Sequence, residues 1–188
     1  MQRPPEATAK SIRVIPASRE QEPILANLLE LYIHDFSEFH PAELKQNGRF
    51  GYKSLPDYWT KPDHHPFLIM VDDKLAGFAL VKKAGALKSD EPVWDMAEFF
   101  IVRAHRNQGI GLASAHQVWQ LFPGQWQVRV MHSNRTALAF WQRAIDAFAG
   151  QSVDPASLER DGKTWAVFAF ESTAAESNQS RRLGRSPL

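Results

Sequence analysis

A strand, a glycine-containing turn and a helix follow one another without interruption in the middle of this chain. Residues 97–102 are almost entirely apolar, which is typical of a buried strand. The turn at 103–111 contains Gly109 and Gly111, and a helix with one apolar face follows it. That face consists of Leu112, Ala115, Trp119 and Phe122. Because another strand is predicted at 125–131, we expect a parallel crossover and an α/β architecture.

Apolar patterns elsewhere predict a strand, a helix and a hairpin before this unit, and a helix and a second hairpin after it. The expected landmarks are a strand at 12–16, a helix opened by Ser18, a hairpin turn at 72–74, a helix N-cap at Asn134 and a hairpin turn at Asp161-Gly162. The interval 35–65 has no clear period. We therefore expect one short helix around Ala42 and otherwise irregular chain there.

The chain has 188 residues, of which 44% are hydrophobic, and this is enough for one core. Neither end carries an apolar period that could be buried. We therefore expect a single domain at 12–171, a flexible N-terminal tail at 1–11 and a flexible C-terminal tail at 172–188.

The charges are nearly balanced, with 22 basic and 21 acidic residues. This balance disfavours nucleic acid and anionic lipid as partners. Cysteine is absent, which excludes disulfides, thiolate metal sites and a cysteine nucleophile, and is typical of a reducing compartment. No apolar run approaches the roughly 20 residues of a membrane helix, and no export signal is visible, so we expect a cytoplasmic protein.

The glycine turn has the local features of a phosphate site. Backbone N–H groups at a helix start have no partner within the helix, and glycine allows an anion to approach them closely. The alternative interpretation is that the glycines only bend the chain. A dinucleotide fingerprint is disfavoured because Ser114 occupies its third glycine position, and a P-loop is disfavoured because Gly-Lys-Ser/Thr is missing.

Two sequence elements resemble the GCN5-related N-acetyltransferase (GNAT) family. Arg106-Asn107-Gln108-Gly109-Ile110-Gly111 fits the family signature [Arg/Gln]-x-x-Gly-x-[Gly/Ala], and Asn134 follows the next strand and precedes a helix, as in the family. The resemblance implies an α/β (α+β) fold. It also implies a mixed, mostly antiparallel central sheet of six to seven strands, helices on both faces, and splayed fourth and fifth strands.

The resemblance also implies that acetyl-CoA is the co-substrate. Backbone amides of the turn would hold its pyrophosphate, arginines at the rim would add positive charge, and the strand end and Asn134 would contact the pantetheine arm. The expected cofactor-binding residues are Phe100, Ile101, Val102, Arg103, Arg106, Asn107, Gln108, Gly109, Ile110, Gly111, Leu112 and Asn134. No metal is expected, because Asp63, His64 and His65, interpreted as loop residues, have no further ligand at a suitable spacing.

Acetyl transfer to an amine requires a base, and Glu98 is the first candidate because similar enzymes often carry a glutamate on this strand. The alternative is that Glu98 belongs to a solvated strand face. Asp95 lies three residues earlier and should therefore point to the opposite face. His132 is a second catalytic candidate, although a histidine at a strand end is more often a polar loop residue.

Many family members have a tyrosine after the helix-capping Asn that protonates the leaving thiolate, but this chain has Phe140-Trp141 there. Because of this departure, two functions stay open. The first is an acetyl-CoA-dependent N-acetyltransferase acting on a primary amine of a small molecule or peptide, as a monomer or homodimer. The second is a non-catalytic protein of the same fold that binds CoA or acyl-CoA and regulates or scaffolds.

The interval 35–65 should border the acceptor side of the site. Its aromatic residues, together with those just before it, could form the wall of an acceptor pocket. The alternative is a satellite core beneath a long loop. The residues concerned are Phe36, Phe39, Phe50, Tyr52, Tyr58 and Trp59.

Overall fold

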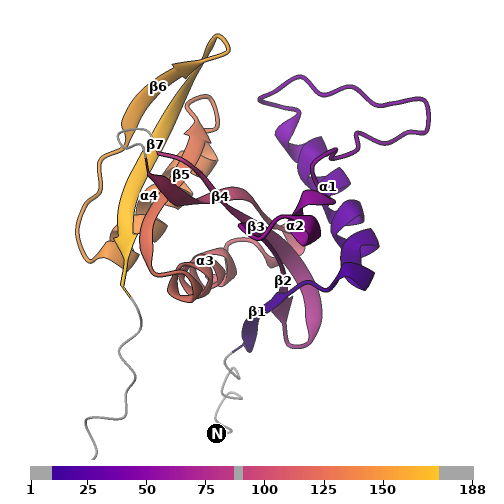
Figure 1. Cartoon of the computed structure of the whole chain (residues 1–188), viewed down its shortest axis with the longest axis horizontal. Helices are drawn as coiled ribbons and strands as arrows, with labels where there is room; N and C mark the ends of the chain where they lie inside the picture. The colour runs from indigo at the N-terminus through magenta and orange to yellow at the C-terminus, as the bar shows by residue number, and fades with distance from the viewer. Residues whose placement is uncertain (1–9, 87–90, 174–188) are drawn as a thin grey trace, which may run out of the picture.

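The computed structural model describes residues 10–86 and 91–173 and contains a seven-stranded mixed sheet (Figure 1). The strands are β1 (Ile12–Pro16), β2 (His64–Val71), β3 (Lys74–Gly85), β4 (Pro92–Ile101), β5 (Gly124–Met131), β6 (Ala156–Arg160) and β7 (Lys163–Ser172). Their order in the sheet is β1-β2-β3-β4-β5-β7-β6. β4 and β5 run parallel, and the other neighbouring strands run antiparallel.

Helices cover both faces of the sheet. They are α1 (Glu22–Phe36), α2 (Asp57–Thr60), α3 (Ile110–Leu121) and α4 (Arg135–Ala149), with one-turn 3-10 helices η1 (Arg19–Gln21) and η2 (Arg103–His105). α1 and α2 pack on one face, and α3 and α4 on the other (Figure 1). None of the helices formed by these described residues has the length and apolar character needed to cross a bilayer.

Alternation along β3 divides the core into its two main halves. Phe78 and Leu80 are fully buried on the α1 side, whereas Ala79 and Val81 are fully buried against α3 and α4. Successive side chains of a strand point to opposite faces, so a strand covered on both faces is apolar throughout. The α3–α4 half is rich in large aromatic rings, including the buried Trp119.

A β-bulge in β4 changes which face each later side chain occupies. Leu80 pairs with Glu98, whereas Val81 pairs with Met96, so Ala97 is an extra residue. Lys82, two residues from Leu80, pairs with Asp95. Glu98 and Asp95 therefore lie on the same face, and the prediction of opposite faces was wrong because an unpaired residue shifts the alternation by one.

β4 and β5 pair near their beginnings, at Trp94–Trp126 and Asp95–Gln127, and then separate. This separation is the splay expected for the fourth and fifth strands, and it leaves a gap in the middle of the sheet. The fold class is confirmed in its mixed sheet, its helices on both faces and this splay.

The irregular segment between α1 and α2 differs from the prediction. No helix forms around Ala42, and Leu44 is exposed there. A short helix needs an apolar face to bury, and this segment has none to offer. His64 and His65 also depart from the prediction, because they lie in β2 rather than in a loop.

The predicted tails lie mostly outside the described residues, at 1–9 and 174–188. At the C-terminal end, β7 extends through Ser172, which is buried and donates its hydroxyl hydrogen bond to the carbonyl of Trp119 at 2.7 Å. The described strand therefore includes the first residue of the expected tail.

Candidate active site

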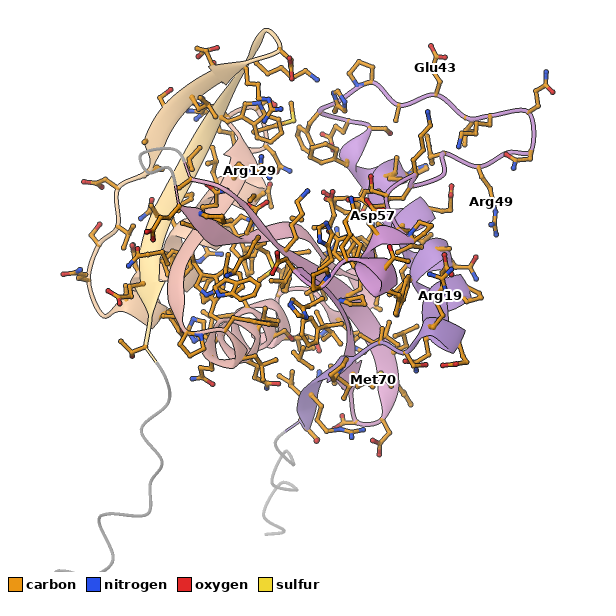
Figure 2. The ribbon with its side chains drawn as sticks, viewed as in Figure 1. Arg19, Glu43, Arg49, Asp57, Met70 and Arg129 are labelled. Carbon is orange, nitrogen blue, oxygen red and sulfur yellow. The ribbon has the colours of Figure 1, made fainter. Side chains whose placement is uncertain are left out.

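A cavity of about 390 Å³ lies where β4 and β5 separate. Its walls come from both strands, from α1 and α4, and from the β6–β7 hairpin. The lining residues that bear on chemistry are Tyr32, Glu98, Phe99, Arg129, Asn134 and Trp165. Figure 2 shows Arg129 beside β4 and β5. The cavity is thus polar in places and aromatic in others.

Glu98 is partly buried in the cavity wall and accepts a hydrogen bond from the Tyr52 hydroxyl at 3.0 Å. Burial raises the pKa of Glu98 above its ordinary value, although hydrogen bonds from Tyr32 and Tyr52 and the charge of Lys82 oppose the rise. A carboxylate of raised pKa that borders a cavity is suited to accept a proton near neutral pH.

Asp95 shares this face but is engaged elsewhere. It is fully buried and forms a salt bridge with Arg129, whose Nη2 lies 2.5 Å from Oδ2 and whose Nε lies 3.3 Å from Oδ1. Burial raises the pKa of Asp95, although Arg129 opposes this. Glu98, hydrogen-bonded to a neutral hydroxyl, is therefore the better-placed base.

The glycine turn presents free amides at the start of α3. Asn107 and Gly109 adopt left-handed conformations, with φ of 59° and 76°. The backbone N–H of Ala113 bonds to the carbonyl of Gly109, so the N–H groups of the three residues between them have no intrahelical acceptor. A Cβ added at Gly109 would meet open space, so its backbone conformation, not crowding, calls for glycine there.

Arg106, the arginine of the family signature, stabilises the turn. Arg106 donates from Nε to the carbonyl of Ile101 at 2.7 Å, and its Nη2 and that of Arg103 each lie 2.6 Å from Asp35 on α1. Burial alone would raise the pKa of Asp35, but the two arginines lower it below its ordinary value. Hydrogen bonding and charge from Asp35 raise the pKa of Arg103.

The free edge of β4 is defined by its pairing with β3. The N–H of Val102 donates to the carbonyl of Ala76 on the β3 side. Because the peptide groups of an antiparallel strand alternate, those of Phe99 and Ile101 face the gap toward β5. Phe99 was missing from the sequence prediction, and the register of β3 and β4 is the information that identifies it.

Asn134 and His132 are placed differently. Asn134 caps α4 by accepting the N–H of Ala137 at 3.0 Å, and it lines the cavity. His132 is exposed and borders a separate depression of about 310 Å³ next to Phe168, not the cavity that contains Glu98. The structure therefore does not bring His132 together with Glu98.

Helix α4 carries Phe140 and Trp141 where the resemblance leads one to expect a tyrosine. Trp141 is 8% exposed and packs against Phe99 and Trp119, with ring centroids 5.2 and 6.1 Å away. The ring of Phe140 lies 3.1 Å from the position of a Cβ at Gly111. Close helix packing is thus one reason for glycine at that position.

Of the six aromatic residues proposed for the acceptor wall, Phe36 lines the cavity. Tyr52, Tyr58 and Trp59 instead pack against α1 in the core, which matches the satellite-core alternative for them. Tyr32 of α1 also lines the cavity. Within residues 10–86 and 91–173, no group of three or more His, Asp or Glu side chains forms a metal-binding cluster.

The sequence of this chain matches a known protein family. The model of the Acetyltransferase (GNAT) family matches residues 25–146, more than half of the chain. No curated protein matches.

Solved structures are similar in fold at low sequence identity. An acetyltransferase from Thermus thermophilus has 15% identity and a TM-score of 0.60, with 86% of this chain and 97% of that chain covered. Arabidopsis thaliana NAA60 in complex with acetyl-CoA has 12% identity and a TM-score of 0.56, with 86% and 98% covered. The ribosomal-protein-S18-alanine N-acetyltransferase from Escherichia coli has 13% identity and a TM-score of 0.57, with 89% and 98% covered.

Proposed function

Because this chain belongs to the acetyltransferase (GNAT) family, we propose that it is an enzyme that transfers the acetyl group of acetyl-CoA to a primary amine of a small molecule or peptide. The observation that carries this proposal is the cavity at the separation of β4 and β5, with Glu98 in its wall. A thioester and an amine held in one such cavity react faster because their reacting atoms are already close.

The residues around the turn fit acetyl-CoA. Free amides at the start of α3 and the open space above Gly109 suit a pyrophosphate. The gap-facing peptide group of Phe99 and the N–H of Ile101 suit the pantetheine arm, and Asn134 lines the same cavity. When bound, acetyl-CoA supplies the thioester carbonyl that an amine attacks.

Glu98 is assigned the role of base. As the C–N bond forms, Glu98 takes the proton of the amine, directly or through a water molecule, and the C–S bond would break with the sulfur leaving as the CoA thiolate, which solvent protonates. Burial brings the pKa of Glu98 closer to neutral pH than that of an ordinary carboxylate, so it binds a proton more readily there. His132 is left without a part in this scheme, because it borders a different depression.

One observation favours a second candidate, a non-catalytic protein that binds CoA or acyl-CoA and regulates or scaffolds. Phe140 and Trp141 have no proton to give to a leaving thiolate near neutral pH, and they stand where many family members carry a tyrosine. A fold alone does not establish turnover.

Calorimetry with acetyl-CoA, followed by an assay for free CoA thiol with a panel of amines, separates these outcomes. The panel should contain amino acids, peptides with free N-termini, polyamines and aminoglycosides. We expect heat of binding and thiol release with at least one amine. Binding without release across the panel supports the second candidate, and no heat with folded protein contradicts both.

A further inference from the structure

All three tyrosines of the chain lie around the carboxylate of Glu98. Tyr32 belongs to α1, Tyr52 to the segment between α1 and α2, and Tyr58 to α2. Burial is the main cause that raises the pKa of each tyrosine, and the negative charge of Glu98 raises it further. Three segments far from β4 in sequence thus converge on one side chain.

Tyr52 makes a direct hydrogen bond to Glu98. Its hydroxyl donates to Oε1 at 3.0 Å in partly buried surroundings. A hydroxyl donates a stronger hydrogen bond to an ionised carboxylate than to a neutral carboxylic acid, so this bond favours the ionised form of Glu98. It also restricts the orientation of the carboxylate in the cavity wall.

Two further charged groups act on Glu98. Lys82 on β3 favours its ionised form, and Asp95 on β4 disfavours it. Asp95 is itself paired with Arg129 on β5, so much of its charge is compensated. Among the described residues, the titratable groups that act on Glu98 from the surrounding elements include Tyr32, Tyr52, Tyr58, Lys82 and Asp95.

Helix α1 holds the backbone next to Tyr52. Both carboxylate oxygens of Glu30 accept backbone hydrogen bonds, from the N–H of Phe50 at 2.7 Å and from that of Gly51 at 2.9 Å. Gly51 has a φ of 72°, a conformation that glycine adopts without strain. The two peptide groups on either side of Phe50 are thereby fixed to α1, close to the hydroxyl of Tyr52 that bonds Glu98.

Tyr58 provides a natural contrast. It is buried at 3% exposure, and among the residues that the structure describes no hydrogen bond joins its hydroxyl to Glu98; it acts instead on Tyr52. Its ring packs at 5.1 Å from that of His64. Tyr58 therefore has the same chemistry and a similar location, without a bond that orients Glu98.

We propose that Tyr52, secured by Glu30, is a positioning residue that holds the Glu98 carboxylate in place for proton transfer. The inference rests on the proposed function, in which Glu98 is the base. It assigns the segment between α1 and α2 a definite part in the reaction, through one hydroxyl and one carboxylate.

The test is a titration of the whole chain, labelled with ¹³C at glutamate side-chain carboxyl carbons, followed by NMR. Glu98→Gln identifies the Glu98 signal by its loss. Tyr52→Phe should move the midpoint of the Glu98 titration upward by about one pH unit, because the ionised form loses a donor. Glu30→Gln should move it in the same direction by less, and Tyr58→Phe, which removes a hydroxyl that does not bond Glu98 itself, should also move it by less than Tyr52→Phe does.

An unmoved midpoint in folded Tyr52→Phe overturns the inference, as does an equal movement in Tyr58→Phe. Once an acceptor is found, the acidic limb of the kcat/KM profile should move with the NMR midpoint in Tyr52→Phe. Failure of acetyl-CoA binding contradicts the proposed function but leaves the NMR outcome readable. Turnover that depends on Glu98, with an unmoved midpoint in Tyr52→Phe, contradicts this inference alone.

Discussion

The turn between β4 and α3 and the segment between α1 and α2 are both attached to α1, but they are built in different ways. The turn is shaped by left-handed residues and a helix start, and it offers backbone N–H groups. The segment at 37–56 has little regular structure, and it acts through side chains such as Tyr52. Local sequence specifies the first kind of site, whereas the second depends on distant partners.

Two acidic residues of α1 make the attachments. Asp35 binds the two arginines of the turn, and Glu30 binds two backbone amides of the segment. Figure 2 shows Glu43 at the outer edge of the segment, away from the sheet. α1 is therefore the common support of the two regions.

The largest effect should come from changing the base on the acceptor side. Glu98→Gln should lower kcat/KM about 10²-fold or more, because an amide cannot accept the proton, while acetyl-CoA affinity stays unchanged. Thiol release and calorimetry measure the two quantities. Glu159→Gln, a change of an exposed carboxylate on β6, is the control, and wild-type kinetics in Glu98→Gln would remove Glu98 from the mechanism.

The turn can be disturbed separately at Gly109. Gly109→Ala should weaken acetyl-CoA binding about tenfold, because a methyl group enters the space assigned to phosphate, and should cost about 1 kcal/mol of stability. Gly150→Ala is the matched control, since Gly150 has a similar φ of 69° and equally open surroundings at the end of α4. An equal loss of affinity in both variants, measured by calorimetry, would count against the turn.

Trp141, which lines the cavity, should contribute to the stability of the fold rather than to the rate of the reaction. Trp141→Phe should lower the free energy of unfolding by about 1–2 kcal/mol, because it removes buried contacts with Trp119 and Phe99. Urea unfolding and thiol release measure the two effects. A large loss of rate in a fully folded variant would show that the indole takes part in the reaction.

The smallest effect is expected at the attachment of the turn to α1. Asp35→Asn should cost roughly 0.5–1 kcal/mol at pH 7, because its arginine partners are substantially exposed and screened by solvent. The lowered pKa of Asp35 means that this stability is present above the ordinary value of 3.8 and is lost as the pH falls through the lower folded value. Urea unfolding should therefore separate variant and wild type at pH 7 and bring them together in strong acid. A constant difference at all pH values would argue against the ion pairs.

Features that depend on neighbours in sequence were predicted well. The hairpin turn at Asp72 and Asp73, the glycine turn and the cap at Asn134 all appear in the structure. Each is decided by the conformational preferences or hydrogen bonds of a few adjacent residues. The helix around Ala42 failed because local composition was the only argument for it.

Features that depend on distant pairing could not be predicted in this way. The bulge at Ala97 is visible only in the register of β3 and β4, and it reverses the expected relation of Asp95 to Glu98. The approach of Tyr32 and Tyr52 to Glu98 likewise joins segments that are 66 and 46 residues away along the chain. No periodicity within one segment contains that information.

The sequence by itself determined the order of the strands and of the three long helices, the amide-bearing turn and the family resemblance, because these depend on short-range preferences and a contiguous motif. Only the tertiary structure decided which carboxylate borders the cavity and which hydroxyl holds it. The physical reason is that a single extra residue in a strand redirects every later side chain, and that burial and charge act between groups the fold brings together.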